Sequence, residues 1–319
     1  MQSSHPILAD LVLIGGGHAH ITVLKAFAMK PLVGLRLTIV TSGSRTPYSG
    51  MLPGYVEGVW QDSDLQIDLR HLAQAANARI IIATVIGINA DLNQIYFSDR
   101  PPLNYDVLSL NIGGQPNING ISGATKYIIP VKPIVNFQER FKTLFDSHLP
   151  RKVAVIGGGA AGCELALALI TRWRTKTGQE PKLTIISQSN NLLPGMARRA
   201  GTLIEKKMRS SGAEIILGRS VILAERRSLT LDNDQTIPFD VCFLVTQVSA
   251  PKWLGNSGLQ LDKDGFVSVT ESLQSVSHPY IFAAGDISSI DKAPRPKAGV
   301  FAVRAGKILA RNLRLYTKG

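Results

Sequence analysis

The feature that most constrains the fold is an apolar run ending in three glycines, because this pattern occurs twice. It reads LVLIGGG at 11–17 and VAVIGGG at 153–159. Each apolar run is typical of a buried parallel strand. Helical spacing follows each glycine run, and a further apolar run follows each helix, at 35–40 and 183–186. Both copies are therefore predicted to be strand–turn–helix–strand units.

These units provide the context that a dinucleotide-binding fingerprint requires. The first glycine permits a tight turn, the second lets the backbone approach a pyrophosphate, and the helix N-terminus presents N–H groups with a partial positive charge. Two such units predict an α/β protein with two Rossmann-like dinucleotide-binding domains. The candidate binding residues are Gly15, Gly17 and His20 in the first unit and Gly157, Gly159 and Gly162 in the second, with His20 in the place of a third glycine.

The surroundings of the two turns leave several points open. His18 and His20 are interpreted as packing residues or phosphate hydrogen-bond donors rather than as metal ligands or a proton relay, and no metal site is predicted. The acid that usually binds an adenosine ribose is missing, because the second strands end in Thr41-Ser42 and Ser187-Gln188. Without that acid nothing repels a 2'-phosphate, and two arginines follow at 198–199. Both NADH and NADPH therefore stay open as cofactors.

The chain is basic towards its end. Its 319 residues carry a net charge of +12, with eight basic residues and one acid between 290 and 319. By default these residues form the solvated face of a final helix, and attraction to an anionic membrane surface is the alternative. Nucleic-acid binding is not expected, because the basic stretches lack interleaved stacking aromatics. Cys163 and Cys242 are expected in the core, and so few cysteines indicate a reducing, cytoplasmic location.

A third motif narrows the class of protein. Residues 270–286 (TESLQSVSHPYIFAAGD) form a predicted strand that ends in Gly285 and Asp286. An acid after an apolar strand has little structural reason to be there, so these two residues are candidates for cofactor binding. With the glycine turns and residues 105–116 (YDVLSLNIGGQP), this motif resembles the glutathione-reductase-type, two-dinucleotide-domain oxidoreductases that use FAD and NAD(P). The resemblance covers nearly the whole chain.

Within that superfamily the chain is most similar to the type II, non-proton-pumping NADH dehydrogenases. Residues 46–54 (TPYSGMLPG) and 296–304 (PKAGVFAVR) also resemble a narrower branch, the flavoprotein module often fused to selenide, water dikinase. The resemblance implies a discontinuous FAD-binding domain, 1–120 and 265–319. An NAD(P)-binding domain, 121–264, would be inserted in it.

The resemblance also implies a role for each candidate in the flavin site. Gly15, Gly17 and His20 would hold the FAD pyrophosphate, and Asp286 would accept hydrogen bonds from the ribityl chain. A helix near Gly299 would aim its N-terminus at the pyrimidine end of the flavin, where it would stabilise negative charge. The remaining candidates are Pro47 and Tyr48 beside the isoalloxazine ring, Gly114 in the crossover segment, and Lys297 and Ala298 before the last helix.

Glu164 is the predicted catalytic residue, because it matches a glutamate that related NADH dehydrogenases place near the nicotinamide and the flavin. A carboxylate in the first turn of a helix is also favoured by the helix dipole alone. The implied reaction passes a hydride from NADH or NADPH to FAD and then electrons to a small-molecule acceptor, with a quinone favoured. An expected CxxxxC dithiol is absent after the first helix, which argues against disulfide reductase chemistry. The quinone-site pattern AQxxAxQ reads AGVFAVR at 298–304, without either glutamine.

The end of the chain raises the last alternatives. The sequence stops at Gly319, directly after the flavin helix, so the usual C-terminal domain is expected to be absent. A partner chain in its place is one alternative, and a non-catalytic nucleotide-binding subunit or sensor is another. We expect a cytoplasmic protein, with peripheral contact at the inner face of the membrane through the basic C-terminal helix as the alternative location.

Overall fold

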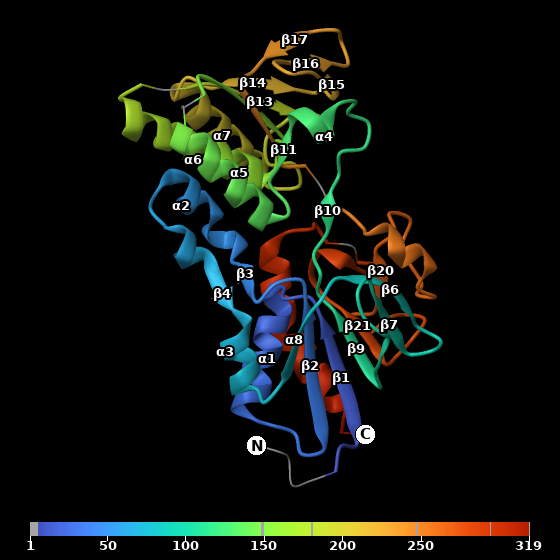
Figure 1. The fold of residues 1–319 in the computed structure, drawn as a ribbon. Helices are drawn as coiled ribbons and strands as arrows, with labels where there is room; N and C mark the ends of the chain where they lie inside the picture. The colour runs from blue at the N-terminus through green and yellow to red at the C-terminus, as the bar shows by residue number, and fades with distance from the viewer. Residues whose placement is uncertain (1–5, 148–149, 180, 247, 294, 319) are drawn as a thin grey trace. The chain divides into compact units, whose positions relative to one another are not determined.

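The structure is a computed structural model that describes residues 6–147, 150–179, 181–246, 248–293 and 295–318. The chain divides into two compact units (Figure 1). Unit 1 comprises Met1–Tyr48, Gln66–Gln115 and Val248–Gly319, and unit 2 comprises Ser49–Leu65 and Pro116–Gln247. Each unit contains one five-stranded parallel sheet. The α/β class and the pair of Rossmann-type units predicted from the two glycine turns are confirmed.

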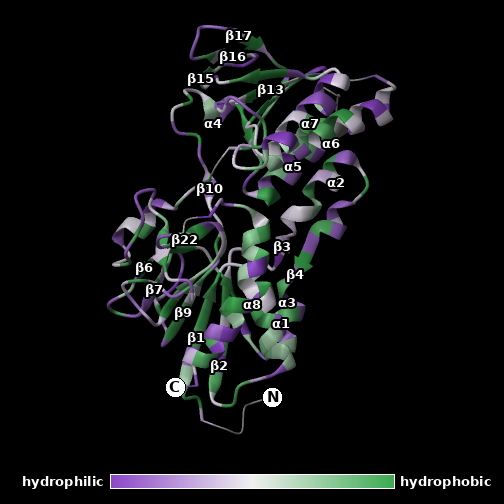
Figure 2. Ribbon diagram, turned by 180° about the vertical axis from the view of Figure 1, so that it is seen from behind, coloured by the Kyte–Doolittle hydropathy of each residue, from purple (hydrophilic) through white to green (hydrophobic). Residues whose placement is uncertain are grey.

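Unit 1 is arranged around the sheet β21-β9-β1-β2-β5. Its strands are β1 (Ala9–Ile14), β2 (Leu35–Thr41), β5 (Arg79–Ile82), β9 (Val107–Leu110) and β21 (Ile281–Ala283). The buried residues of β1 and β21 form continuous apolar runs, and those of β9 are apolar except for Ser109, because both faces of the sheet are covered (Figure 2). Leu11 in β1 is aligned with both Leu37 and Val107, so β1 lies at the centre of the sheet.

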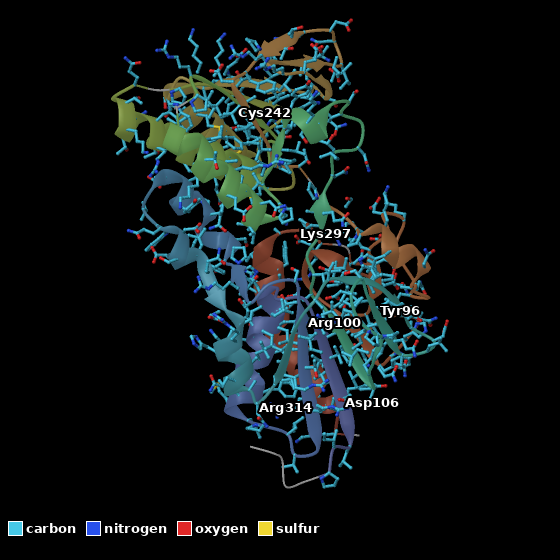
Figure 3. All side chains as sticks on the ribbon, in the orientation of Figure 1. Tyr96, Arg100, Asp106, Cys242, Lys297 and Arg314 are labelled. Atoms are coloured by element: carbon cyan, nitrogen blue, oxygen red, sulfur yellow. The ribbon has the colours of Figure 1, made fainter. Side chains whose placement is uncertain are left out.

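Three helices and several short elements complete unit 1. Helix α1 (His18–Met29) packs against both α3 (Leu69–Ala75) and α8 (Gly299–Tyr316). The smaller elements are β3 (Arg45–Pro47), β4 (Gln66–Asp68), β6 (Val85–Asn89), β7 (Gln94–Phe97), β8 (Leu103–Asn104), η3 (Lys252–Asn256), β20 (Val267–Val269), η4 (Gly285–Ile287) and β22 (Ser288–Ile290). Strands β6, β7 and β8 form an antiparallel sheet. At the far end of α8, the guanidinium of Arg314 donates to the carbonyl oxygen of Ala26 at 3.0 Å and so ties α8 to the last turn of α1 (Figure 3).

Unit 2 repeats this plan with the sheet β11-β18-β12-β13-β14. Its strands are β11 (Ile129–Pro130), β12 (Lys152–Ile156), β13 (Lys182–Ser187), β14 (Glu214–Leu217) and β18 (Val241–Leu244). Its helical elements are η1 (Ser49–Met51), α2 (Leu52–Glu57), η2 (Asp62–Leu65), α4 (Ala124–Tyr127), α5 (Ile134–Ser147), α6 (Ala160–Thr177) and α7 (Arg198–Ser210). Strands β15 (Val221–Ala224), β16 (Ser228–Leu231) and β17 (Thr236–Pro238) form an antiparallel sheet. The short strands β10 (Gln115–Pro116) and β19 (Val248–Ser249) pair with each other where the chain passes from one unit to the other, and β19 belongs to unit 1.

The internal repeat extends well beyond the two glycine turns. The spatial order β9-β1-β2-β5 in unit 1 corresponds to β18-β12-β13-β14 in unit 2. In unit 1 the antiparallel sheet β6-β7-β8 comes directly before β9, the strand beside β1. In unit 2 the antiparallel sheet β15-β16-β17 comes directly before β18, the strand beside β12. Residues that follow β9 and β18 therefore occupy equivalent places beside the two glycine turns.

The units differ from the predicted domains at two main segments. Residues 49–65 belong to unit 2, because Leu52, Val56 and Leu65 are buried in its apolar core and α2 packs against α6. Residues 248–264 belong to unit 1, because η3 packs against β6. The crossover after Gln115 also comes five residues before the predicted boundary at 120. Which cofactor each unit binds stays a prediction at this point.

Candidate functional site

The first glycine turn joins β1 to α1 in unit 1. Gly15 has a φ of +96°, in the left-handed region, and a side chain at Gly15 or Gly17 would collide with Asn111. Gly17 is the N-cap of α1, and the first turn of the helix contains no acidic residue. The positive end of the helix dipole is therefore not neutralised by a charge from α1 itself. This is the arrangement that an anionic group such as a pyrophosphate can use.

Asn111 holds this turn, although sequence reasoning did not single it out. It follows β9 directly, and only 3% of it is exposed. Its Oδ1 accepts hydrogen bonds from the backbone N–H groups of Ala19 at 3.1 Å and His20 at 3.4 Å. Its Nδ2 donates to the carbonyl oxygen of Ala284 at 2.6 Å, and its own carbonyl oxygen accepts from Gly17 N–H at 3.2 Å. The available sequence signal was a polar residue directly after a buried apolar strand.

His20 is buried and binds the protein itself through both ring nitrogens. Its Nδ1 lies 2.7 Å from the carbonyl oxygen of Gly15, and its Nε2 lies 2.8 Å from Ser109 Oγ. A carbonyl oxygen only accepts, so Nδ1 donates and Nε2 accepts from the serine hydroxyl. Burial lowers the pKa of His20 to about 4, which keeps the ring neutral. The geometry therefore favours packing and turn closure over the phosphate contact that was expected of this side chain.

The predicted flavin loop lies beside the same helix. Pro47 ends β3, which pairs with β4, and Tyr48 follows it with 37% of its surface exposed. The rings of Tyr48 and His18 are 5.0 Å apart at their centroids and tilted by 59°. His18 is the first residue of α1. The structure therefore brings Pro47, Tyr48 and His18 to the N-terminal end of α1, where the fingerprint turn also lies.

Gly285 and Asp286 lie at the carboxyl end of β21. Gly285 has a φ of +77°, and a side chain there would lie 2.6 Å from Asn111 Nδ2. Asp286 is 8% exposed and lies in η4, which packs against α8. Because β21, β9 and β1 are parallel neighbours, their carboxyl ends bring Asp286, Asn111 and the first glycine turn to one edge of the sheet. This edge is where ligands bind in open α/β sheets.

The start of α8 supplies a second helix N-terminus, and its N-cap residue makes no side-chain hydrogen bond. Gly299 is its first residue and Ala298 its N-cap, and the first turn contains no acid. Lys297 lies shortly before α8 (Figure 3) and is half-buried. Its Nζ donates to the carbonyl oxygen of Ser288 at 2.6 Å and lies 3.9 Å from the centre of the Phe266 ring. Burial lowers the pKa of Lys297, while Asp262 and Asp286 oppose this shift. A cation and a helix N-terminus therefore occur together near η4.

Gly114 has a different structural setting. A side chain there would lie 2.6 Å from Val248, so close packing of two backbone segments is enough to require glycine. Its predicted contact with a cofactor stays a prediction.

The second glycine turn joins β12 to α6 in unit 2. Gly157 has a φ of +128°, and a side chain there would collide with the carbonyl of Val245. A side chain at Gly162 would collide with the carbonyl of Gly157. Gly159 differs, because an added Cβ would meet nothing within 4 Å. The space beside Gly159 is thus open at the N-terminus of α6, which has no side-chain cap and no acid in its first turn.

Glu164 lies further along α6 than expected. The helix begins at Ala160, so Glu164 is its fifth residue, and the prediction that it lies in the first turn is wrong. Four helical residues precede Glu164, because the helix starts directly after Gly159, which has extended backbone geometry and serves as the N-cap. Glu164 is solvent-exposed, and partial shielding from water raises the pKa of its carboxyl group. The helix dipole therefore explains the presence of an acid at this position less well than the sequence suggested, because the dipole effect falls off after the first turn.

Both cysteines are buried, as expected. Cys163 donates from Sγ to the carbonyl oxygen of Gly158 at 3.5 Å, and burial raises its pKa to about 11. Cys242 lies in β18, and burial raises its pKa as well. Neither thiol is therefore an available nucleophile. Among the described residues there is also no group of three or more His, Cys, Asp or Glu side chains placed to hold a metal ion.

Comparisons with known proteins identify a matching family and similar relatives. A profile of the family described as "Pyridine nucleotide-disulphide oxidoreductase" matches residues 9–306. The "NADH dehydrogenase-like protein YutJ" of Bacillus subtilis is 21% identical over 291 residues, which cover 90% of this chain and 79% of that protein. The "NADH oxidase" of Methanocaldococcus jannaschii is 25% identical over 320 residues, which cover 95% and 69%.

A solved structure has a similar fold. The structure of reduced Bacillus anthracis CoADR-RHD is similar with a TM-score of 0.84 at 22% identity, over 98% of this chain. The match spans 57% of that longer chain. The similarity shows a shared fold.

Proposed function

Because the chain belongs to the pyridine nucleotide-disulphide oxidoreductase family, we propose that it is an FAD-dependent NAD(P)H dehydrogenase of the type II kind. The family uses FAD and NAD(P)H. The observation that carries the proposal is the occurrence of two fingerprint turns, each at a helix N-terminus with no acid in its first turn, with Asp286 beside the first. The finer resemblance to the module often fused to selenide, water dikinase is part of the same proposal.

The residues of unit 1 fit FAD. The turn Gly15–Gly17 and the N-terminus of α1 would hold the pyrophosphate, and Asp286 would bind the ribityl chain. Pro47 and Tyr48 would flank the ring system, beside His18. When bound there, FAD would supply two-electron chemistry and take a hydride from NAD(P)H. The start of α8 and Lys297 would stabilise negative charge at the pyrimidine end of the ring.

Unit 2 is the proposed site for the nicotinamide nucleotide. The open space beside Gly159 would let the backbone approach the pyrophosphate, and the free end of α6 would attract its charge. Glu164 is the proposed nicotinamide-positioning and catalytic acid, because it matches a glutamate that related NADH dehydrogenases place near the nicotinamide and the flavin. Ser187 and the exposed Gln188 stand where the ribose-binding acid usually lies, so we keep NADH and NADPH as alternatives.

A quinone is the electron acceptor that we favour, by resemblance. The buried state and raised pKa of Cys163 and Cys242 argue against transfer of electrons through a thiol pair. The alternative is a non-catalytic nucleotide-binding subunit or sensor. These alternatives are separated by the rate of NADH and NADPH oxidation with quinone, dioxygen and disulfide acceptors in parallel. Turnover with none of them, by a protein that has FAD bound, would support the sensor.

Peripheral contact with the cytoplasmic face of a membrane is a second part of the proposal. The exposed residues of α8 combine the apolar Val300, Val303, Ile308 and Leu315 with the basic Arg304, Lys307 and Arg311. No helix among the described residues has the length and apolar character needed to cross a bilayer. Each basic residue near an anionic lipid surface contributes about 1 kcal/mol. A partner chain that covers this face is the alternative occupant.

A further inference from the structure

The two glycine turns are built alike but differ at one equivalent position. Asn111 follows β9, and Val245 follows β18. A side chain on Gly15 would strike the carbonyl of Asn111, and one on Gly157 would strike the carbonyl of Val245. The backbones of Asn111 and Val245 thus close the two turns in the same way. Their side chains are different in kind, since one is a polar amide and the other is aliphatic.

The side chain of Asn111 enters the first turn. A Cβ on Gly17 would collide with its amide group, whereas a Cβ on Gly159, the equivalent residue in unit 2, would meet nothing within 4 Å. Asn111 Oδ1 accepts hydrogen bonds from the second and third residues of α1, Ala19 and His20. These are the N–H groups that a capping residue usually satisfies. The first turn is therefore capped by Asn111, which follows a strand distant in the sequence, whereas among the described residues no side-chain cap is found at the N-cap of the second turn.

The other half of the amide reaches a second part of the candidate site. Asn111 Nδ2 donates to the carbonyl oxygen of Ala284, two residues before Asp286. A side chain on Gly285 would lie 2.6 Å from the same nitrogen. Three glycines of the site, at 15, 17 and 285, thus have their side-chain space taken by this one residue. Because the amide is buried and both of its ends are bonded, it fixes one arrangement of these segments.

We propose that Asn111 is a positioning residue for FAD, which sets the fingerprint turn at α1 in register with the Asp286 segment before the cofactor binds. This inference rests on the proposed function, because it takes unit 1 to be the FAD site. The neutral amide suits the task for two reasons. Its oxygen accepts from α1 while its nitrogen donates to Ala284, and it adds no negative charge beside the place proposed for the pyrophosphate.

Two substitutions separate positioning from simple structural support. Asn111→Asp keeps the size of the side chain and the oxygen that accepts from α1. It replaces the donor to Ala284 by a second oxygen, which would face the carbonyl oxygen of Ala284, and it adds a negative charge near the place proposed for the pyrophosphate. Asn111→Ala removes all three side-chain hydrogen bonds, those with Ala19, His20 and Ala284, without adding charge. The matched control is Asn104→Asp, which adds the same charge at an exposed residue of β8 in unit 1. Val is a further useful replacement at 111, because it is the residue at the equivalent position of unit 2.

The experiment measures the Kd of FAD for apo-protein of the full chain by quenching of flavin fluorescence, at low and high salt. We expect Asn111→Ala and Asn111→Val to raise the Kd by about tenfold, independently of salt. We expect Asn111→Asp to raise it further at low salt and to approach the alanine variant at high salt, because salt screens the added charge. Asn104→Asp should bind FAD as the wild type does.

Hydrogen exchange of the apo-protein gives a readout without cofactor. The N–H groups of Ala19 and His20 should exchange faster in Asn111→Ala than in the wild type, while those of the Gly157–Cys163 turn should not change. Variants that lose thermal stability but bind FAD with wild-type affinity at both salt concentrations would overturn the inference alone. Wild-type protein that binds no FAD would overturn the proposed function, and the inference with it.

Discussion

His20 Nδ1 donates a hydrogen bond to the carbonyl oxygen of Gly15 at 2.7 Å, five residues earlier in the chain. At the equivalent place in unit 2, Gly162 packs against the carbonyl of Gly157. His20, which replaces the third glycine of the fingerprint, therefore closes the first turn with a hydrogen bond. Gly162 closes the second turn by close packing. Because His20 is buried and neutral, the first turn depends on pH.

The pH dependence has a definite sign. Burial lowers the pKa of His20 to about 4, whereas an unfolded histidine titrates near ~6.5. The stabilisation is fully present above pH ~6.5 and is lost as the pH falls towards about 4, because protons then bind the unfolded chain preferentially. We expect wild-type protein to lose on the order of 2 kcal/mol more unfolding free energy than His20→Gly between pH 7 and pH 5. Urea unfolding of both proteins at the two pH values measures this, and an equal loss in both would contradict it.

The two outer glycines of the second turn should respond differently to the same substitution. Gly157→Ala should unfold unit 2 or prevent its expression, because φ is +128° and the Val245 carbonyl occupies the side-chain space. Gly159→Ala should leave the melting temperature unchanged and weaken NADH and NADPH binding about tenfold, because the methyl group fills the open space at the end of α6. Thermal melts and nucleotide titrations test both. Unweakened binding by a folded Gly159→Ala protein would argue against a nucleotide site there.

Asp286 should matter for cofactor retention more than for folding. Asp286→Asn keeps the size of a side chain that is 8% exposed, but removes the charged acceptor that we propose for the ribityl hydroxyls. We expect it to raise the dissociation rate of FAD about tenfold or more, with a small change in the melting temperature. Release of fluorescent FAD after dilution measures this rate. Asp264→Asn, at an exposed position in unit 1, is the matched control, and equal FAD release from both variants would contradict the role of Asp286.

Membrane contact can be tested through the exposed face of α8. Arg304, Lys307 and Arg311 are all exposed, and replacing all three by glutamine should weaken binding to vesicles with anionic lipid, at about 1 kcal/mol for each charge. The control is a triple variant of α7 in which Arg199, Lys206 and Lys207 are replaced by glutamine, because it removes the same amount of charge. Co-sedimentation with anionic and neutral vesicles compares them. Equal losses in the two triple variants would indicate attraction to net charge alone.

The parts of the fold that the sequence predicted are those with local signals. Apolar runs and glycine turns predicted β1, β12 and the helices that follow them, and the Ala-Ala-Gly-Asp motif predicted the end of β21. The membership of residues 49–65 in unit 2 had no such signal, since it depends on how Leu52 and Val56 pack against a helix more than a hundred residues away. A local pattern cannot reveal which distant surface a short apolar helix will cover.

The residues of the candidate site also divide into those with a local sequence signal and those without one. The glycines of both turns and Asp286 were named from motifs, whereas Asn111 was missed as a functional residue because its partners, Ala19 and Ala284, lie 92 and 173 residues away in the chain. The role of His20 also depended on such a contact, through Ser109. Residues that act by holding other segments in place are defined by the folded structure.

Anaerobic titration of the FAD-loaded protein with NADH, and in parallel with NADPH, tests the central claim most directly. The account predicts that the visible absorbance of the flavin is lost with one equivalent of at least one of the two nucleotides, and that Glu164→Gln slows this loss. A protein that binds FAD but keeps the oxidised spectrum with both nucleotides in excess would contradict the claim that this chain is an NAD(P)H dehydrogenase.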